Sequence, residues 1–128
     1  MMIRVVIAGP SGLLRDLIGS SFVPRDIAVV GNARRAADLA HLCVVERPDV
    51  VVAEADFEDG STLEDVIDHV HASGARVIVV ADRLSLDRVE ALVARGVSRS
   101  FSHDAGPVVV EAVYSVYSEA AGAGTQGR

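Results

Sequence analysis

The sequence predicts an α/β fold in which a doubly wound, five-stranded parallel sheet is covered by helices on both faces. Short β-branched segments alternate along the 128-residue chain with longer segments of helical period. Three of these segments are nearly continuous Val and Ile, which is typical of parallel strands buried on both faces. Right-handed crossovers between such strands place the connecting helices on both sides of the sheet.

The expected strands are short and bounded by turn residues. The first strand is apolar, but Gly9, Pro10 and Gly12 follow it directly. The apolar run is therefore too short for the core of a signal peptide. No other apolar run approaches the roughly 18 residues that a membrane-spanning helix needs. We predict strands at residues 2–8, 26–30, 49–54, 76–81 and 97–102.

The helices predicted between these strands have recognisable starts. The first covers residues 12–21, and the second begins near Asn32 as its N-cap. The third opens with Ser61-Thr62-Leu63-Glu64, a capping-box pattern, the fourth covers 85–95, and the fifth begins at Pro107. The apolar positions expected to face inward on the first three are Leu13, Leu14, Leu17, Ile18, Ala36, Leu39, Ala40, Cys43, Leu63, Val66, Ile67 and Val70.

Length and charge indicate one domain without a nucleic-acid surface of its own. Residues 1–120 are expected to form it, and residues 121–128, which are small and polar, to form a flexible tail or the start of a linker. The net charge is −6, and acids and bases are interspersed, so no basic stripe exists for a phosphate backbone. All 12 basic residues are Arg, and the single Cys43 is expected to be a buried thiol, as in a cytoplasmic protein.

The turn AGPSG directly after the first strand is a candidate phosphate-binding loop. It lacks the second Gly and the Lys that a Walker loop requires. A dinucleotide-binding turn is an alternative, because Gly9 and Gly12 lie between a strand and a helix, although its third Gly would fall at Arg15. Arg34 and Arg35 after the second strand would then hold the 2′-phosphate of NADP.

Four segments carry a resemblance to a known family: RVVIAGPSGLLRDLI, RDIAVVGNARRAADLAHLCVVERPDVVVAE, GARVIVVA and EALVARGVSRSFSHDAGPVVVEAV. In order and spacing they resemble the receiver domain of bacterial response regulators, with most likeness to receivers that precede a LuxR-type helix-turn-helix. The resemblance covers residues 2–120, and ERPDVVVAE is its most specific part. It implies a flavodoxin-like (βα)5 fold with strand order 2-1-3-4-5.

The resemblance also implies a site that this chain does not preserve. Receivers carry an acidic pair for Mg2+ after the first strand, a phosphoacceptor Asp after the third, a hydroxyl after the fourth and a Lys after the fifth. These functions fall at Gly9 and Pro10, Glu54, Ala81 and His103, and the switch aromatic falls at Ser100. We call Gly9, Pro10, Glu54, Ala81 and His103 the degenerate pocket.

The chemistry of phosphorylation needs groups that this pocket lacks. Mg2+ usually requires one or two carboxylates, and phosphoryl transfer requires cations that stabilise the equatorial oxygens. We therefore expect no catalysis, no metal and no cofactor, and interpret AGPSG as an acid pocket without its acids. The acids Asp56, Glu58 and Asp59 lack the register of a calcium loop and are expected to form a solvated loop.

The predicted function is regulation independent of phosphorylation, in a transcription regulator whose DNA-binding output domain is absent from this chain. An alternative is a ligand-binding module that holds a small molecule against Gly9–Ser11, Glu54, Ala81 and His103. His103 is expected to be solvated or to pair with Glu54 as an imidazolium.

The last helix predicts a homodimer. Val109, Ala112, Val113 and Val116 share one stripe suited to packing on the sheet. A second stripe of Val110, Tyr114 and Tyr117 is expected to form the dimer interface, unless a thick core covers both stripes.

Overall fold

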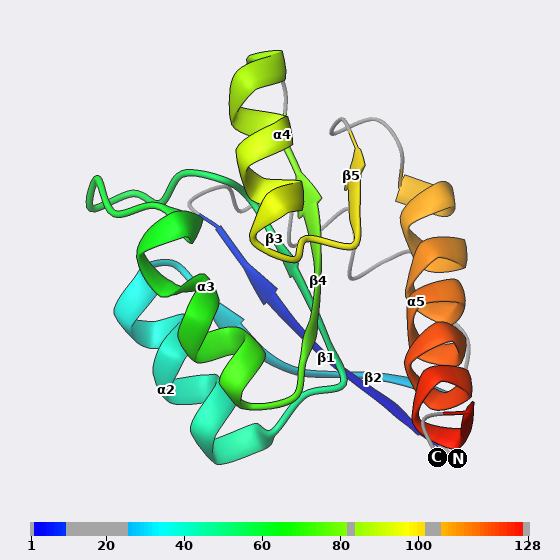
Figure 1. The fold of residues 1–128 in the computed structure, drawn as a ribbon. Coiled ribbons are helices and arrows are strands. Elements are labelled where there is room, and N and C mark those ends of the chain that lie inside the picture. The colour runs from blue at the N-terminus through cyan, green and yellow to red at the C-terminus, as the bar shows by residue number, and fades with distance from the viewer. Residues whose placement is uncertain (1, 10–25, 82–83, 102–105, 127–128) are drawn as a thin grey trace.

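The sheet is parallel and has five strands. The computed structural model describes residues 2–9, 26–81, 84–101 and 106–126. The strand order is β2-β1-β3-β4-β5, and every neighbouring pair is parallel (Figure 1). This confirms the predicted fold class and strand order. The strands are β1 (Ile3–Ala8), β2 (Ile27–Ala33), β3 (Val50–Ala53), β4 (Arg76–Val80) and β5 (Arg99–Phe101).

The described helices are α2 (Ala36–Glu46), α3 (Leu63–Ala72), α4 (Leu86–Ala94) and α5 (Gly106–Gln126). The helix predicted at residues 12–21 lies outside the described residues. The N-cap of α3 is Thr62, whose backbone N–H donates a 2.8 Å hydrogen bond to the Asp65 carboxylate. The capping box therefore lies one residue later than the predicted one. The Ser85 hydroxyl caps α4 by accepting from the Arg88 N–H at 3.2 Å.

The prediction that Asn32 caps the second helix is wrong. Asn32 lies within β2, opposite Ile7 of β1, and the N-cap of α2 is Arg35. Strand β2 continues because its pairing with β1 shifts register between Val5 and Val6 and then resumes up to Ala33. Sheet pairing thus determines the conformation of a residue whose side chain favours a helix cap.

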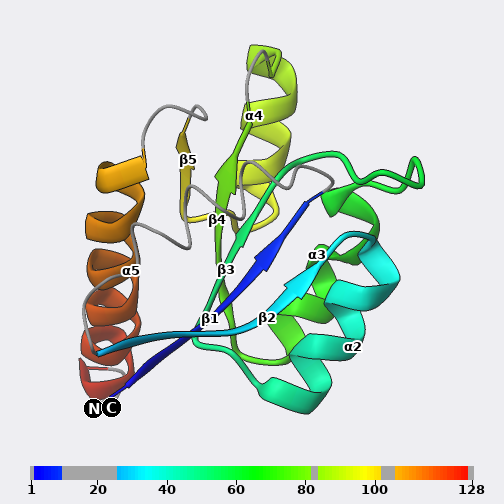
Figure 2. The ribbon, with the colours of Figure 1, turned by 180° about the vertical axis from the view of Figure 1, so that it is seen from behind.

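Two apolar clusters lie on opposite faces of the sheet, because successive strand residues point to opposite sides. One cluster joins Val6, Val51 and Val77 of the sheet to α2, α3 and Leu92 of α4. The other joins Ile7, Val52 and Ile78 to Val109, Ala112, Val113 and Val116 of α5. In both views α2 and α3 lie together on one side of the sheet and α5 lies on the other (Figures 1 and 2). The expected double winding is therefore present.

The C-terminal helix is longer than the sequence suggested. Its backbone is helical up to Gln126, so residues 121–126 belong to α5. The division between a domain at residues 1–120 and a tail at 121–128 stays a prediction. Among the residues that the structure describes, no helix is both long and apolar enough to cross a membrane.

Candidate functional site

The candidate site lies where the parallel strands end. Gly9, Glu54 and Ala81 directly follow β1, β3 and β4, respectively. The register places Ala8 opposite Ala53, and Ala53 opposite Val79. The residue after β3 therefore lies between those after β1 and β4, at the sheet edge where α/β proteins commonly bind ligands.

Glu54 is the buried charged residue of the described part of the chain, with 7% of its surface exposed. Its N–H donates to the Ala8 carbonyl at 2.8 Å, and the N–H of Gly9 donates to the Ala33 carbonyl at 2.8 Å. These two backbone bonds extend the pairing of β1 with β2 and of β3 with β1 by one residue each. The side chain of Glu54 is consequently held at the sheet edge and shielded from solvent.

The side chain of Glu54 packs directly against the backbone of Gly9. A Cβ atom at residue 9 would lie 2.8 Å from Cγ and 2.9 Å from Cδ of Glu54, and closer still to Oε2. Real Cβ atoms essentially never approach other heavy atoms so closely. The side chain of Glu54 thus occupies the space that any side chain at residue 9 would need. Gly9 and Glu54, which both depart from the receiver pattern, are therefore sterically coupled.

The other members of the degenerate pocket are only partly described. Ala81 is half-buried, and its N–H donates to the Phe101 carbonyl at 2.9 Å. Ser100 lies in β5 and is exposed. Pro10, Ser11 and His103 lie outside the described residues, so the pairing of His103 with Glu54 stays a prediction.

Sequence reasoning missed an ionic cluster beside this pocket, which is centred on Arg88 of α4. The guanidinium contacts both carboxylate oxygens of Glu64 at 2.9 Å, the Ala55 carbonyl at 3.0 Å and the Asp56 carboxylate at 2.9 Å. Asp56 is therefore a partner of α4 and not simply a solvated acid. The residues that Arg88 bonds are 24 to 33 positions away, so no local spacing could indicate the cluster.

Electrostatics within this cluster favour the charged forms. The hydrogen bonds from Arg88 lower the pKa of Glu64 below its ordinary value, against a smaller opposing effect of burial. Hydrogen bonds to Glu64 and Asp56 in turn raise the pKa of Arg88. The contact between Arg88 and Glu64 is bidentate, a geometry that generally makes an ion pair stronger than a single-point surface contact.

The remaining acids of this loop are also engaged. Glu58 pairs with Arg34 at 3.0 Å, and the N–H of Ser61 donates to Asp59 at 3.0 Å. The bonds from Ser61 lower the pKa of Asp59. Arg35 pairs with Asp38 at 3.1 Å. Both arginines of the NADP alternative are therefore occupied by carboxylates of the chain itself.

The predicted interface stripe of α5 is half-buried. Val110, Tyr114 and Tyr117 pack in part against the apolar cluster beneath α5. The Tyr114 hydroxyl donates to the Asp26 carboxylate at 2.6 Å, which raises the pKa of that tyrosine. Part of each of these side chains is covered by the core, as the thick-core alternative expects. The rest of the stripe remains accessible to solvent.

No protein-family model matches the chain, and no curated protein does. Solved structures do match. The receiver domain of NarL from Mycobacterium tuberculosis is similar at a TM-score of 0.82 and 21% identity, covering 91% of this chain and 97% of that one. The receiver domain of RcsB from Escherichia coli is similar at a TM-score of 0.80 and 13% identity, covering 93% and 95%. A LuxR-family response regulator from Staphylococcus aureus is similar at a TM-score of 0.79 and 18% identity, covering 91% and 99%.

The sheet order, the helices on both faces and these similarities define the fold as that of response-regulator receiver domains. The similarities extend over nearly the whole length of the compared chains. At 13–21% identity these similarities show the fold alone, because one fold can host unrelated functions.

Proposed function

We propose that this chain is a pseudo-receiver: a regulatory receiver domain that acts without phosphorylation and controls the dimerisation and output of a transcription regulator. DNA would be bound by an output domain absent from this chain, in the cytoplasm. The observation that carries the proposal is the contact between Glu54 and Gly9, since it fills the place of the acid that a metal would need.

The physical argument concerns charge. Among the described residues at the strand ends, Glu54 is the acid that could meet a cation, and Gly9 and Ala81 offer no side-chain oxygen. Mg2+ prefers near-octahedral oxygen coordination and usually one or two carboxylates. A buried carboxylate is also a poor phosphoacceptor when no cation stabilises the transferred group. These features support regulation that does not depend on phosphorylation.

We expect acetyl phosphate or beryllofluoride with Mg2+ to leave the protein unmodified. The acids that would hold Mg2+ are missing, and so is the Lys. Neither cation is therefore available to stabilise the transferred phosphoryl group. Intact mass spectrometry and Mg2+-dependent spectral changes test this. A phosphoryl adduct on Glu54 would contradict the proposal.

The matched variant is Glu54→Asp, which supplies the usual phosphoacceptor but leaves Gly9 and Ala81 in place. We expect it to stay unlabelled as well, because one carboxylate restores neither the metal site nor the cation. Robust labelling of this single variant would show that the pocket retains phosphotransfer chemistry.

We expect the unmodified protein to form a homodimer through the accessible part of Val110 and Tyr117. A specific dimer should bury at least about 1,000 Å2 in total. The double substitution of both residues by Glu should shift the protein toward monomer in sedimentation experiments. Tyr114 is left unchanged in this variant, because a carboxylate there would face Asp26.

Val44→Glu is the control, since Val44 is 73% exposed on α2, on the other side of the sheet. It should leave the dimer intact. A monomer at high micromolar concentration, or a dimer that the α5 double substitution does not weaken, would disprove the interface.

A further inference from the structure

A groove between α2 and α3 lies away from the degenerate pocket. It is a cavity of about 420 Å3, a size within the range of small-molecule sites. Its apolar lining comes mainly from Ala40, Cys43, Val44 and Ala72. Val44 is 73% exposed and the adjacent Val45 is 59% exposed, so large apolar side chains face solvent at this end of α2. The groove thus offers apolar surface that the fold does not cover.

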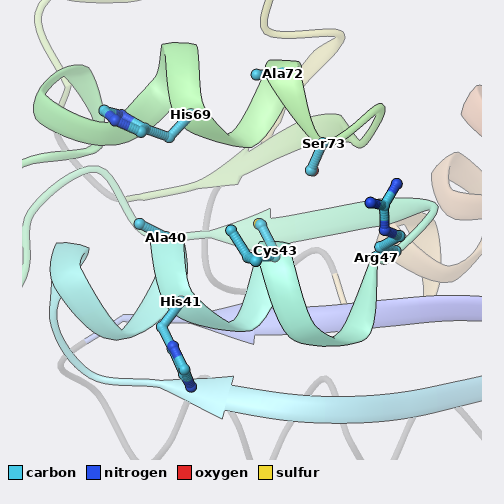
Figure 3. Close-up of a pocket in the computed structure, with 8 residues that line it drawn as sticks. Ala40, His41, Cys43, Arg47, His69, Ala72 and Ser73 are labelled. Atoms are coloured by element: carbon cyan, nitrogen blue, oxygen red, sulfur yellow. The ribbon is translucent and has the colours of Figure 1, made fainter.

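One end of the groove carries a permanent positive charge. Arg47 follows α2 as its C-cap and has a φ of 46°, which is the left-handed conformation. The other described residues with a positive φ are all glycines. Figure 3 shows Arg47 at the end of α2, on the side where Ser73 follows α3, whereas His41 and His69 lie toward the other end. None of the described residues that line the groove carries a carboxylate.

The described part of the chain provides no partner for the Arg47 guanidinium, although acids are frequent on both helices. Each of those acids is engaged by another group. The pairs are Asp38 with Arg35, Glu46 with Arg4, Glu64 with Arg88, Asp65 with the N–H of Thr62, and Asp68 with Arg95. The charge of Arg47 is therefore available to an external anion.

The thiol in the groove is not suited to covalent chemistry. Burial raises the pKa of Cys43, which outweighs the opposing effect of its hydrogen bond with Ser73. A thiol of this kind behaves as a small apolar group. It contributes to the apolar surface of the groove instead of acting as a nucleophile.

We propose that this groove binds a small carboxylic acid with an apolar body. The carboxylate pairs with the planar guanidinium of Arg47, which can donate two parallel hydrogen bonds. The apolar body lies along Ala40, Val44 and Ala72 and removes their surfaces from water. This site is separate from the degenerate pocket and does not depend on the proposed absence of phosphorylation.

The test is a titration of the isotope-labelled protein with decanoate, below its micelle concentration, followed by amide chemical shifts. We expect saturable changes at Ala40, Val44, Arg47 and Ala72. Decyltrimethylammonium, which has the same chain and the opposite charge, should not bind there. Arg47→Asn keeps a residue that tolerates the left-handed conformation and should weaken decanoate binding at least about tenfold.

Arg76→Gln is the matched control, because Arg76 is an exposed arginine outside the groove, and its affinity for decanoate should equal that of the unchanged protein. Ala72→Leu should reduce binding by filling exposed space in the groove. The proposal is overturned if decanoate fails to bind saturably, if Arg47→Asn binds it equally well, or if shifts at the groove depend on protein concentration alone, which would assign the surface to a second copy.

Discussion

Replacing Arg88 by Ala should destabilise the protein by about 2–3 kcal/mol, because it leaves polar groups of Glu64 and Ala55 without their donor in a half-buried place. The side chains of Arg88 and Glu64 are 25% and 27% exposed, so solvent screens this pair only in part. Asp56 is 65% exposed and contributes little. Denaturant unfolding measures the loss.

The effect should concentrate on α4. Leu92 is its one fully buried described residue, and ionic contacts through Arg88 and Arg95 attach the helix to α3. We expect amide hydrogen exchange in α4 to increase in Arg88→Ala far more than exchange in α2. Arg99→Ala is the control, because Arg99 also forms an ion pair but at a more exposed site, and it should cost less than about 1 kcal/mol. Equal losses for both variants would disprove the special importance of Arg88.

The pH dependence of this pair has a definite sign. Because the folded-state pKa of Glu64 is lowered, its contribution is fully present above the ordinary glutamate pKa of about 4.3 and is lost as pH falls through the lowered value. The stability difference between the unchanged protein and Arg88→Ala should therefore narrow in acid. A difference that stays constant through that range would mean that the lost stability comes from packing of the arginine stem.

Much of the fold could be predicted from the sequence because it depends on periodic patterns. Continuous Val and Ile runs mark strands buried on both faces, and all five predicted strands are present with their order. Local signals were less accurate at the helix starts. Asn32 has a suitable side chain for a cap, yet its pairing with Ile7 extends the strand instead. Tertiary pairing overrides local propensity at such positions.

The positions of Gly9, Glu54 and Ala81 at the strand ends could be predicted from the sequence, but the contacts of these residues could not. Gly9 and Glu54 could be singled out because they depart from the receiver pattern, whereas their direct contact follows from the register of β1 and β3. The Arg88 cluster and the hydrogen bond between Tyr114 and Asp26 join residues far apart in the chain, the latter by 88 positions. No periodicity reports contacts of that range.

The contact between Gly9 and Glu54 leads to the second large expected effect. Gly9→Ala should destabilise the protein by about 2–3 kcal/mol, because the new methyl group overlaps Cγ and Cδ of a buried side chain and forces it to move. In a Glu54→Ala background that obstacle is absent, so the same change should cost less. Denaturant unfolding of both single variants and the double variant measures the coupling, which we expect to be about 1–2 kcal/mol.

Gly60→Ala is the matched control for this cycle. A Cβ at residue 60 would meet no atom within 4 Å, and its positive φ of 85° carries only the backbone cost of about 1 kcal/mol. That cost should be the same with Glu54 or Ala at residue 54. Additive losses for Gly9→Ala and Glu54→Ala would mean that Glu54 moves aside freely, and residue 9 could then accept an acid without rearrangement. A large coupling would instead mean that an acidic pair cannot be rebuilt at residue 9 while Glu54 remains, so the buried glutamate itself keeps the pocket without its metal-binding acid.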